Sequence, residues 1–137
     1  MDIKELLIKH EGLRKKPYKD TVGKLTIGVG RNLDDVGLSL EECHYLLDND
    51  IKSVENSLII QLPWYKSLDP VRKDILKNMC FNLGINGLLG FSVTLKEIEK
   101  GHYQTAAQHM LDSKWASQVK GRAKELADMM ITGKYSS

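Results

Sequence analysis

The sequence has few cysteines, no long apolar run and little excess of either charge. Its two cysteines, Cys43 and Cys80, lack CxxC or histidine spacing, which predicts free thiols rather than a disulfide or a metal site. No run approaches the ~20 apolar residues of a membrane-spanning helix, and the N-terminal segment has no apolar signal region. We therefore expect synthesis in the cytoplasm and no membrane insertion. A net charge of +2 does not require a nucleic-acid partner.

Residues 9–31 join a short amphipathic helix to a predicted β-hairpin. Asp2 and Glu5 have capping-box spacing, and apolar residues recur at intervals of three and four, which predicts a helix over residues 2–11 that ends at Gly12. Glu11 then lies in the last turn, where the helix dipole disfavours a negative charge. From Leu25 to Gly30 the period changes to two, which predicts a strand with an apolar face and an open face of Thr26 and two glycines.

Glu11, Asp20 and Thr26 are the candidate catalytic residues of this stretch. Two carboxylates beside an open strand face can hydrolyse a glycosidic bond, because one protonates the leaving oxygen and the other orients water. A Glu and an Asp at this spacing are also common as ordinary solvated charges. The spacing alone leaves both interpretations open.

These three residues belong to a longer motif with particular residue types at set positions. It is spelled by Glu11, Gly12, Arg14, Tyr18, Asp20, Gly23, Thr26, Ile27, Gly28 and Gly30. This run, E-G-x-R-x-x-x-Y-x-D-x-x-G-x-x-T-I-G-x-G, resembles the phage-type lysozymes, the endolysins of glycoside hydrolase family twenty-four that include those of the T-even coliphages. Residues 67–91, followed by Trp115, Arg122 and Ala123, extend the resemblance over nearly the whole chain.

The resemblance implies an α+β, mainly α, lysozyme-like fold. It also implies a muramidase that hydrolyses the β-1,4 bond between N-acetylmuramic acid and N-acetylglucosamine in peptidoglycan, with inversion and without a cofactor or metal. Its partners would be peptidoglycan glycan strands and not nucleic acid. The expected protein is a monomer that is made in the host cytoplasm and reaches the cell wall after a separate holin opens the membrane.

Further site residues follow from the resemblance. Those expected to contact substrate are Gly30, Asn32, Phe81, Thr94 and His109. Phe81 could equally belong to the core. Arg122 is expected to hold Glu11 in place. Where T-even phage members have a histidine, this sequence has Arg31, for which we predict an ion pair with Asp50 across the small lobe.

The remaining sequence predicts mostly helices. Ser39 and Glu42 form a capping box that begins a long helix over residues 39–60, which is either the connector between two lobes or a plain bundle helix. Asp69 and Pro70 begin a second helix, whose wide apolar face predicts a central buried position. Shorter helical patterns cover residues 97–100, 103–111 and 120–130, with a break over 113–117.

These elements predict a single lysozyme domain over residues 1–137. The small β lobe would take residues 12–38, the connecting helix residues 39–60, and the helical lobe residues 1–11 together with 61–137. A non-catalytic peptidoglycan-binding module is the competing interpretation, although all three candidate catalytic residues are present. The basic cluster Arg14, Lys15, Lys16 and Lys19 is either a contact for anionic wall polymer or a solvated surface.

Overall fold

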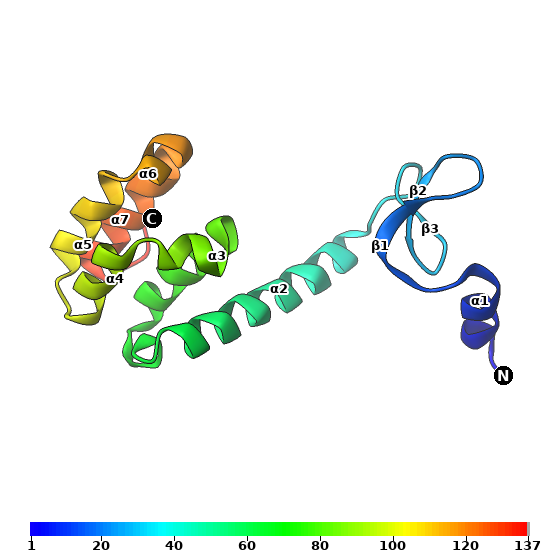
Figure 1. Ribbon diagram of the computed structural model, residues 1–137, viewed down its shortest axis with the longest axis horizontal. Helices are drawn as coiled ribbons and strands as arrows, with labels where there is room; N and C mark the ends of the chain where they lie inside the picture. The colour runs from blue at the N-terminus through cyan, green and yellow to red at the C-terminus, as the bar shows by residue number, and fades with distance from the viewer. Residues whose placement is uncertain (137) are drawn as a thin grey trace. The chain divides into compact units, whose positions relative to one another are not determined.

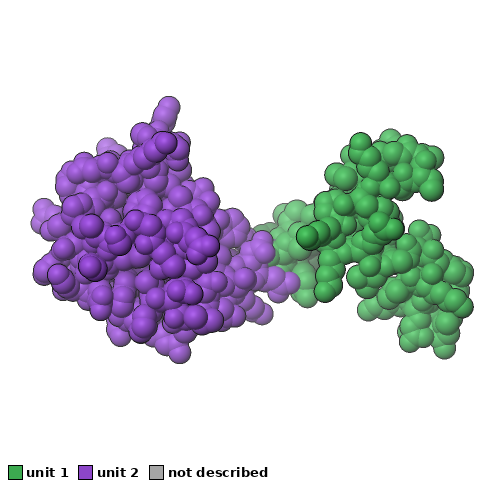
Figure 2. All heavy atoms as spheres, viewed as in Figure 1, with its two compact units in different colours: residues 1–46 green, residues 47–137 purple. Residues whose placement is uncertain are grey.

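The computed structural model describes residues 1–136 and divides the chain into two compact units, residues 1–46 and residues 47–137 (Figure 2). The helices are α1 (Ile3–Glu11), α2 (Leu40–Gln61), α3 (Pro70–Leu89), α4 (Ser92–Glu99), α5 (Tyr103–Leu111), α6 (Lys114–Val119), α7 (Gly121–Thr132) and the short 3-10 helix η1 (Tyr65–Ser67). The strands are β1 (Arg14–Lys19), β2 (Leu25–Gly28) and β3 (Arg31–Asn32) (Figure 1). This composition confirms the predicted α+β, mainly α, fold class.

Unit 1 begins with the predicted helix and hairpin. The Asp2 carboxylate caps α1 by accepting a hydrogen bond from the Glu5 N–H over 2.8 Å, and the helix ends at Gly12, whose φ is +79°. The strands form an antiparallel sheet in the order β1, β2, β3. Asp20 begins the turn between β1 and β2, and its carbonyl accepts a hydrogen bond from the Gly23 N–H. Local capping and turn chemistry are therefore enough to define these elements.

The long helix α2 starts with the predicted capping box. The Glu42 N–H donates to Ser39 Oγ over 3.1 Å, and the Ser39 N–H donates to the Glu42 carboxylate over 2.8 Å. Arg31 Nη1 donates to the same carboxylate over 2.6 Å, so the partner of Arg31 is Glu42 and the prediction of Asp50 is wrong. Glu42 lies in the first turn of α2, close to the strand of Arg31, whereas Asp50 lies about 12 Å further along the helix axis.

The Glu42 carboxylate should make stability depend on pH. The hydrogen bond from Arg31 and the backbone hydrogen bond from Ser39 lower the pKa of Glu42 to about 2. Because the folded-state pKa lies below the unfolded value of about 4.3, the stabilisation is complete above that value and is lost as the pH falls toward 2. Between about pH 5 and pH 2, the free energy of unfolding should fall less in Glu42→Gln than in wild type.

Urea unfolding across this pH range measures the effect. Glu41→Gln is the matched control, because Glu41 is an exposed neighbour that takes part in no ion pair among the described residues. The difference between wild type and Glu42→Gln should shrink at high salt, since both side chains of the pair are partly exposed. Parallel pH profiles for wild type and Glu42→Gln would contradict this prediction.

Unit 2 is built around α3, as its sequence predicts. The Asp69 carboxylate caps this helix, and Pro70 is its first residue. Ile75, Leu76 and Met79 are almost completely buried. Helix α5 packs against α4 and α7, and other buried core residues of unit 2 are Leu58, Leu62, Leu95, Ile98, Met110, Trp115, Leu126 and Met130.

Helix α6 was not predicted, because residues 113–117 lack a helical apolar pattern. The Ser113 hydroxyl caps it by accepting a hydrogen bond from the Ala116 N–H over 3.1 Å. Trp115 is 4% exposed, and its indole N–H donates to Asn82 Oδ1 over 2.8 Å. A side-chain cap, the buried Trp115 and the packing of Ala116 and Val119 against the core together stabilise this short helix.

The unit boundary falls within α2, and α1 belongs to the same unit as the sheet. The predicted grouping of residues 1–11 with the helical lobe concerns the arrangement of the two units and stays a prediction. Cys43 is exposed, Cys80 is buried, and both are free thiols. Among residues 1–136, no helix has both the length and the apolar character needed to cross a lipid bilayer.

Candidate active site

Glu11 is the last residue of α1, and its carboxylate lies against the turn between β2 and β3. A Cβ atom added at Gly30 would be only 3.1 Å from Glu11 Oε2, and Gly30 has a φ of +70°. A side chain at this position would therefore be strained by its backbone and crowded by Glu11. Because Gly30 has no side chain, the Glu11 carboxylate can lie close to its backbone. Within unit 1 the Glu11 side chain is exposed.

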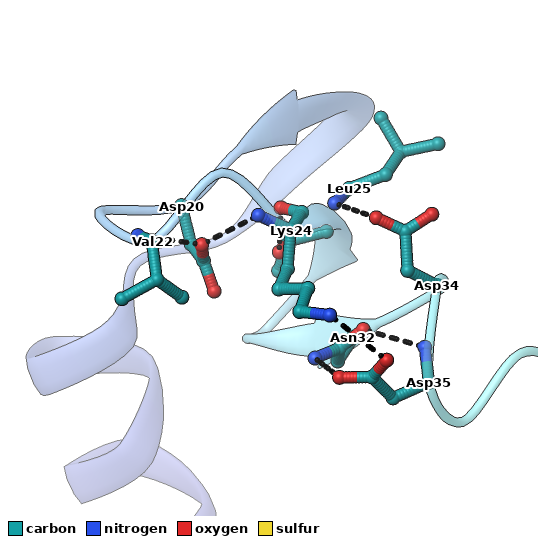
Figure 3. A network of polar contacts seen from close by, with 8 residues as sticks. Asp20, Val22, Lys24, Leu25, Asn32, Asp34 and Asp35 are labelled. Atoms are coloured by element: carbon teal, nitrogen blue, oxygen red, sulfur yellow. Dashed lines mark hydrogen bonds and ion pairs between the residues drawn. The ribbon is translucent and has the colours of Figure 1, made fainter.

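Asp20 is fixed at the opposite end of the hairpin by its own turn. One carboxylate oxygen, Oδ1, accepts hydrogen bonds from the Val22 N–H over 3.0 Å and the Lys24 N–H over 2.8 Å (Figure 3). No group among the described residues donates to the other oxygen, Oδ2. The turn thus holds the carboxylate in place while leaving one oxygen able to bind water.

Thr26 lies in the central strand and is buried, with 3% of its surface exposed. Its hydroxyl donates to the Lys24 carbonyl over 2.9 Å, which links it to the turn that Asp20 closes. Tyr18 and Asn32 are its register partners on the two flanking strands. The predicted open strand face is therefore wrong at Thr26, because neighbours cover a central-strand residue on both sides. The prediction of an open face is correct at Gly28, where an added Cβ would meet no atom within 4 Å.

Asn32, an expected substrate contact, takes part in a polar network with the loop that follows β3. Its amide Nδ2 donates to the Asp35 carboxylate over 3.0 Å, and its Oδ1 accepts from the Asp35 N–H over 2.9 Å. Lys24 forms an ion pair with Asp35, and Asp34 accepts a hydrogen bond from the Leu25 N–H (Figure 3). The spacing of Asn32 and Asp35 is a turn signal that could have indicated the first of these contacts.

Two of the predicted substrate residues, Thr94 and His109, line one groove of unit 2. The groove has a volume of about 420 Å³ and also contains Phe91 and Trp115. These two rings pack edge to face with centroids 6.0 Å apart. Thr94 is buried whereas His109 is exposed, so a ligand in the groove would meet polar groups at different depths.

Phe81 and Arg122 line a second cavity of unit 2, of about 390 Å³. Phe81 is 49% exposed and is therefore not a core residue. Arg122 Nη2 donates to Asn78 Oδ1 over 2.6 Å and to the Asn78 carbonyl over 3.2 Å. Lys77 lies in the same cavity, and its hydrogen bond to Glu55 raises the pKa of its ammonium group. The expected contact of Arg122 with Glu11 stays a prediction.

Sequence reasoning missed Asn78 and Lys77, because each meets a partner far away in the sequence. Asn78 lies 44 positions before Arg122, and no local pattern indicates that the two side chains meet. Within residues 1–136, no three His, Cys, Asp or Glu side chains gather closely enough to hold a metal ion.

Comparison with known proteins identifies the family of this chain. The family model for phage lysozyme matches residues 8–129. A probable T4-type lysozyme of Dictyostelium discoideum is 31% identical, with 96% of this chain and 94% of the relative aligned. The SAR-endolysin of Escherichia phage Mu is 30% identical over 95% of this chain and 80% of its own length.

One relative is much longer than this chain. The pre-baseplate central spike protein Gp5 of Enterobacteria phage T4 is 27% identical over 100% of this chain but only 29% of its own length. The match to the Dictyostelium protein extends over 161 aligned positions, more than the 137 residues here, so that relative has segments that this chain lacks.

Since the family model covers most of the sequence and the Dictyostelium relative is matched over nearly its full length, the chain belongs to the phage lysozyme family and is a lysozyme hydrolase.

Proposed function

We propose that this lysozyme is a muramidase that hydrolyses the β-1,4 bond between N-acetylmuramic acid and N-acetylglucosamine in peptidoglycan. One observation carries the proposal: unit 1 holds the Glu11 carboxylate against Gly30 and fixes the Asp20 carboxylate at the turn between β1 and β2. Two carboxylates on neighbouring elements are the groups that most glycosidases use. The names of the relatives, lysozyme and endolysin, support the same reaction.

In this mechanism Glu11 is the general acid. It donates its proton to the glycosidic oxygen as the bond between that oxygen and the anomeric carbon breaks. A water molecule bound to Asp20 Oδ2 attacks the anomeric carbon from the opposite face and gives a proton to Asp20. Thr26 helps to hold this water through its hydroxyl oxygen. The product then has the inverted configuration, because a single displacement has occurred.

Substrate contacts complete the proposed site. Gly30 and Asn32 would contact the glycan from unit 1, and Phe81, Thr94 and His109 would do so from unit 2. The groove that contains Thr94 and His109 combines an aromatic pair with polar groups, a composition that suits a sugar or a peptide branch. Arg122 would support Glu11. We assign it a positioning role, since Asn78 already holds its guanidinium group.

The proposed biological setting is lysis of a bacterial host by a phage. The protein would act as a monomer, and it would need no cofactor. It would be synthesised in the host cytoplasm and would reach the wall after a separate holin had permeabilised the membrane. The endolysin name of the relative from phage Mu supports this setting.

The stereochemistry of the product tests the mechanism. Purified peptidoglycan incubated with the protein should yield new reducing ends whose first-formed anomer is α, because inversion converts a β linkage into an α product. Proton NMR during the first minutes distinguishes the anomers before they equilibrate. A β product, or a glycosyl adduct on Asp20, would exclude Asp20 as the base. Binding to peptidoglycan without new reducing ends would identify a non-catalytic module.

A further inference from the structure

The edge strand β1 carries an unpaired positive surface. We call Arg14, Lys15, Lys16 and Lys19 the basic strand; all four side chains are exposed. The sheet order places β1 at the edge. None of the four takes part in an ion pair among the described residues, whereas Lys24 and Arg31 of the same unit pair with Asp35 and Glu42. The unit therefore has four cations without an acidic partner on a single strand.

The basic strand adjoins the proposed catalytic residues. Tyr18 pairs with Thr26 and Arg14 with Gly28, so Arg14 and Tyr18 share the sheet face of Thr26. The Arg14 guanidinium carbon lies 4.3 Å from the centre of the Tyr18 ring, which holds this cation over the face. Lys19 directly precedes Asp20. Positive charge therefore extends along the hairpin up to the turn that fixes the candidate base.

We propose that the basic strand binds the carboxylates of the stem peptides that branch from the peptidoglycan glycan. This inference rests on the proposed function, and it assigns the strand a role in substrate binding. Charge complementarity selects the partner, because stem peptides end in free carboxylates and none of the four cations is paired with a carboxylate among the described residues. The contacts are exposed, so the attraction should act mainly at low ionic strength.

Binding measured without turnover tests this proposal independently of catalysis. The protein carries Glu11→Gln, and the probe is a set of soluble, fluorescently labelled glycan fragments with intact stem peptides. Adding Lys15→Gln, Lys16→Gln and Lys19→Gln should raise the Kd about tenfold at low salt, within the range of steering effects. The difference should disappear as salt is added. Circular dichroism confirms that the variants are folded.

Two controls isolate the charge contact. Replacement of three exposed lysines of unit 2, Lys52, Lys100 and Lys124, changes the net charge equally and should leave the Kd within about twofold of its parent. Fragments whose peptide carboxylates have been converted to amides should bind the basic-strand variant and its parent equally.

Equal Kd values for the basic-strand and unit 2 variants on intact fragments would overturn the proposal. The same loss on amidated fragments would also overturn it, because the lysines would then affect binding without contacting the peptide carboxylates. Failure of the proposed function gives a different result, namely no new reducing ends with the wild-type protein whatever the Kd values are.

Discussion

Replacing Glu11 with Gln should slow peptidoglycan hydrolysis by about a thousandfold, the middle of the range for removal of a general acid. The amide has almost the same shape as the carboxylic acid but cannot donate a proton to the glycosidic oxygen. The fold should not change, because the Glu11 side chain is exposed in unit 1 and forms no ion pair with another residue of that unit. The initial rate of release of reducing ends measures the loss.

Glu5→Gln is the matched control, since Glu5 is also an exposed residue of α1. Its backbone N–H, which Asp2 caps, is retained in that variant. The control should keep the wild-type rate and the wild-type circular dichroism spectrum. A rate for Glu11→Gln within a few-fold of wild type would remove Glu11 from the reaction and leave the two-carboxylate mechanism without its acid.

Local signals predicted the part of the site that lies between α1 and the hairpin. The Asp2 cap, the positive φ of Gly12 and the turn closed by Asp20 depend only on residues close in sequence. The Ser39 and Glu42 capping box predicted the start of α2 for the same reason. Short-range hydrogen bonds of this kind are encoded by residue type and spacing, so a single sequence is enough to find them.

Contacts between distant segments could not be predicted in this way. The partner of Arg31 depends on where the loop after β3 places the first turn of α2, and no periodicity gives that position. The burial of Thr26 requires knowledge of both strands beside β2. The groove of Thr94 and His109 combines residues from four helices, so it exists only after those helices have packed.

The largest expected effect on stability concerns Arg72, which joins α3 to the end of α7. Its Nε donates to the Met130 carbonyl over 2.9 Å, and its Nη2 donates to the Ile131 carbonyl over 3.2 Å. Carbonyls in the last turn of a helix have no partner within that helix, and the negative end of its dipole attracts a cation. The Arg72 side chain is only 12% exposed, so water cannot easily replace it.

Two further contacts hold the guanidinium group in this position. Its Nη1 forms a 3.1 Å ion pair with Asp69, and its central carbon lies 3.5 Å from the centre of the Tyr103 ring. A planar group with five donors can make all these contacts at once, whereas a lysine ammonium group cannot. Gly133 follows α7 with a φ of +70°, and a Cβ there would lie 2.9 Å from Arg72 Nη1. The glycine therefore leaves room for the arginine.

Arg72→Met should consequently lower the free energy of unfolding by about 3 kcal/mol, because it keeps the aliphatic stem but loses charged hydrogen bonds and the stacked cation. Arg72→Lys should fall between this variant and wild type. Lys96→Met is the control, since Lys96 is an exposed lysine of α4 without an ion pair in the described chain, and it should change stability by less than about 0.5 kcal/mol. Urea unfolding followed by the fluorescence of Trp64 and Trp115 measures all three. If Arg72→Met proved as stable as Lys96→Met, the end of α7 would not depend on this arginine.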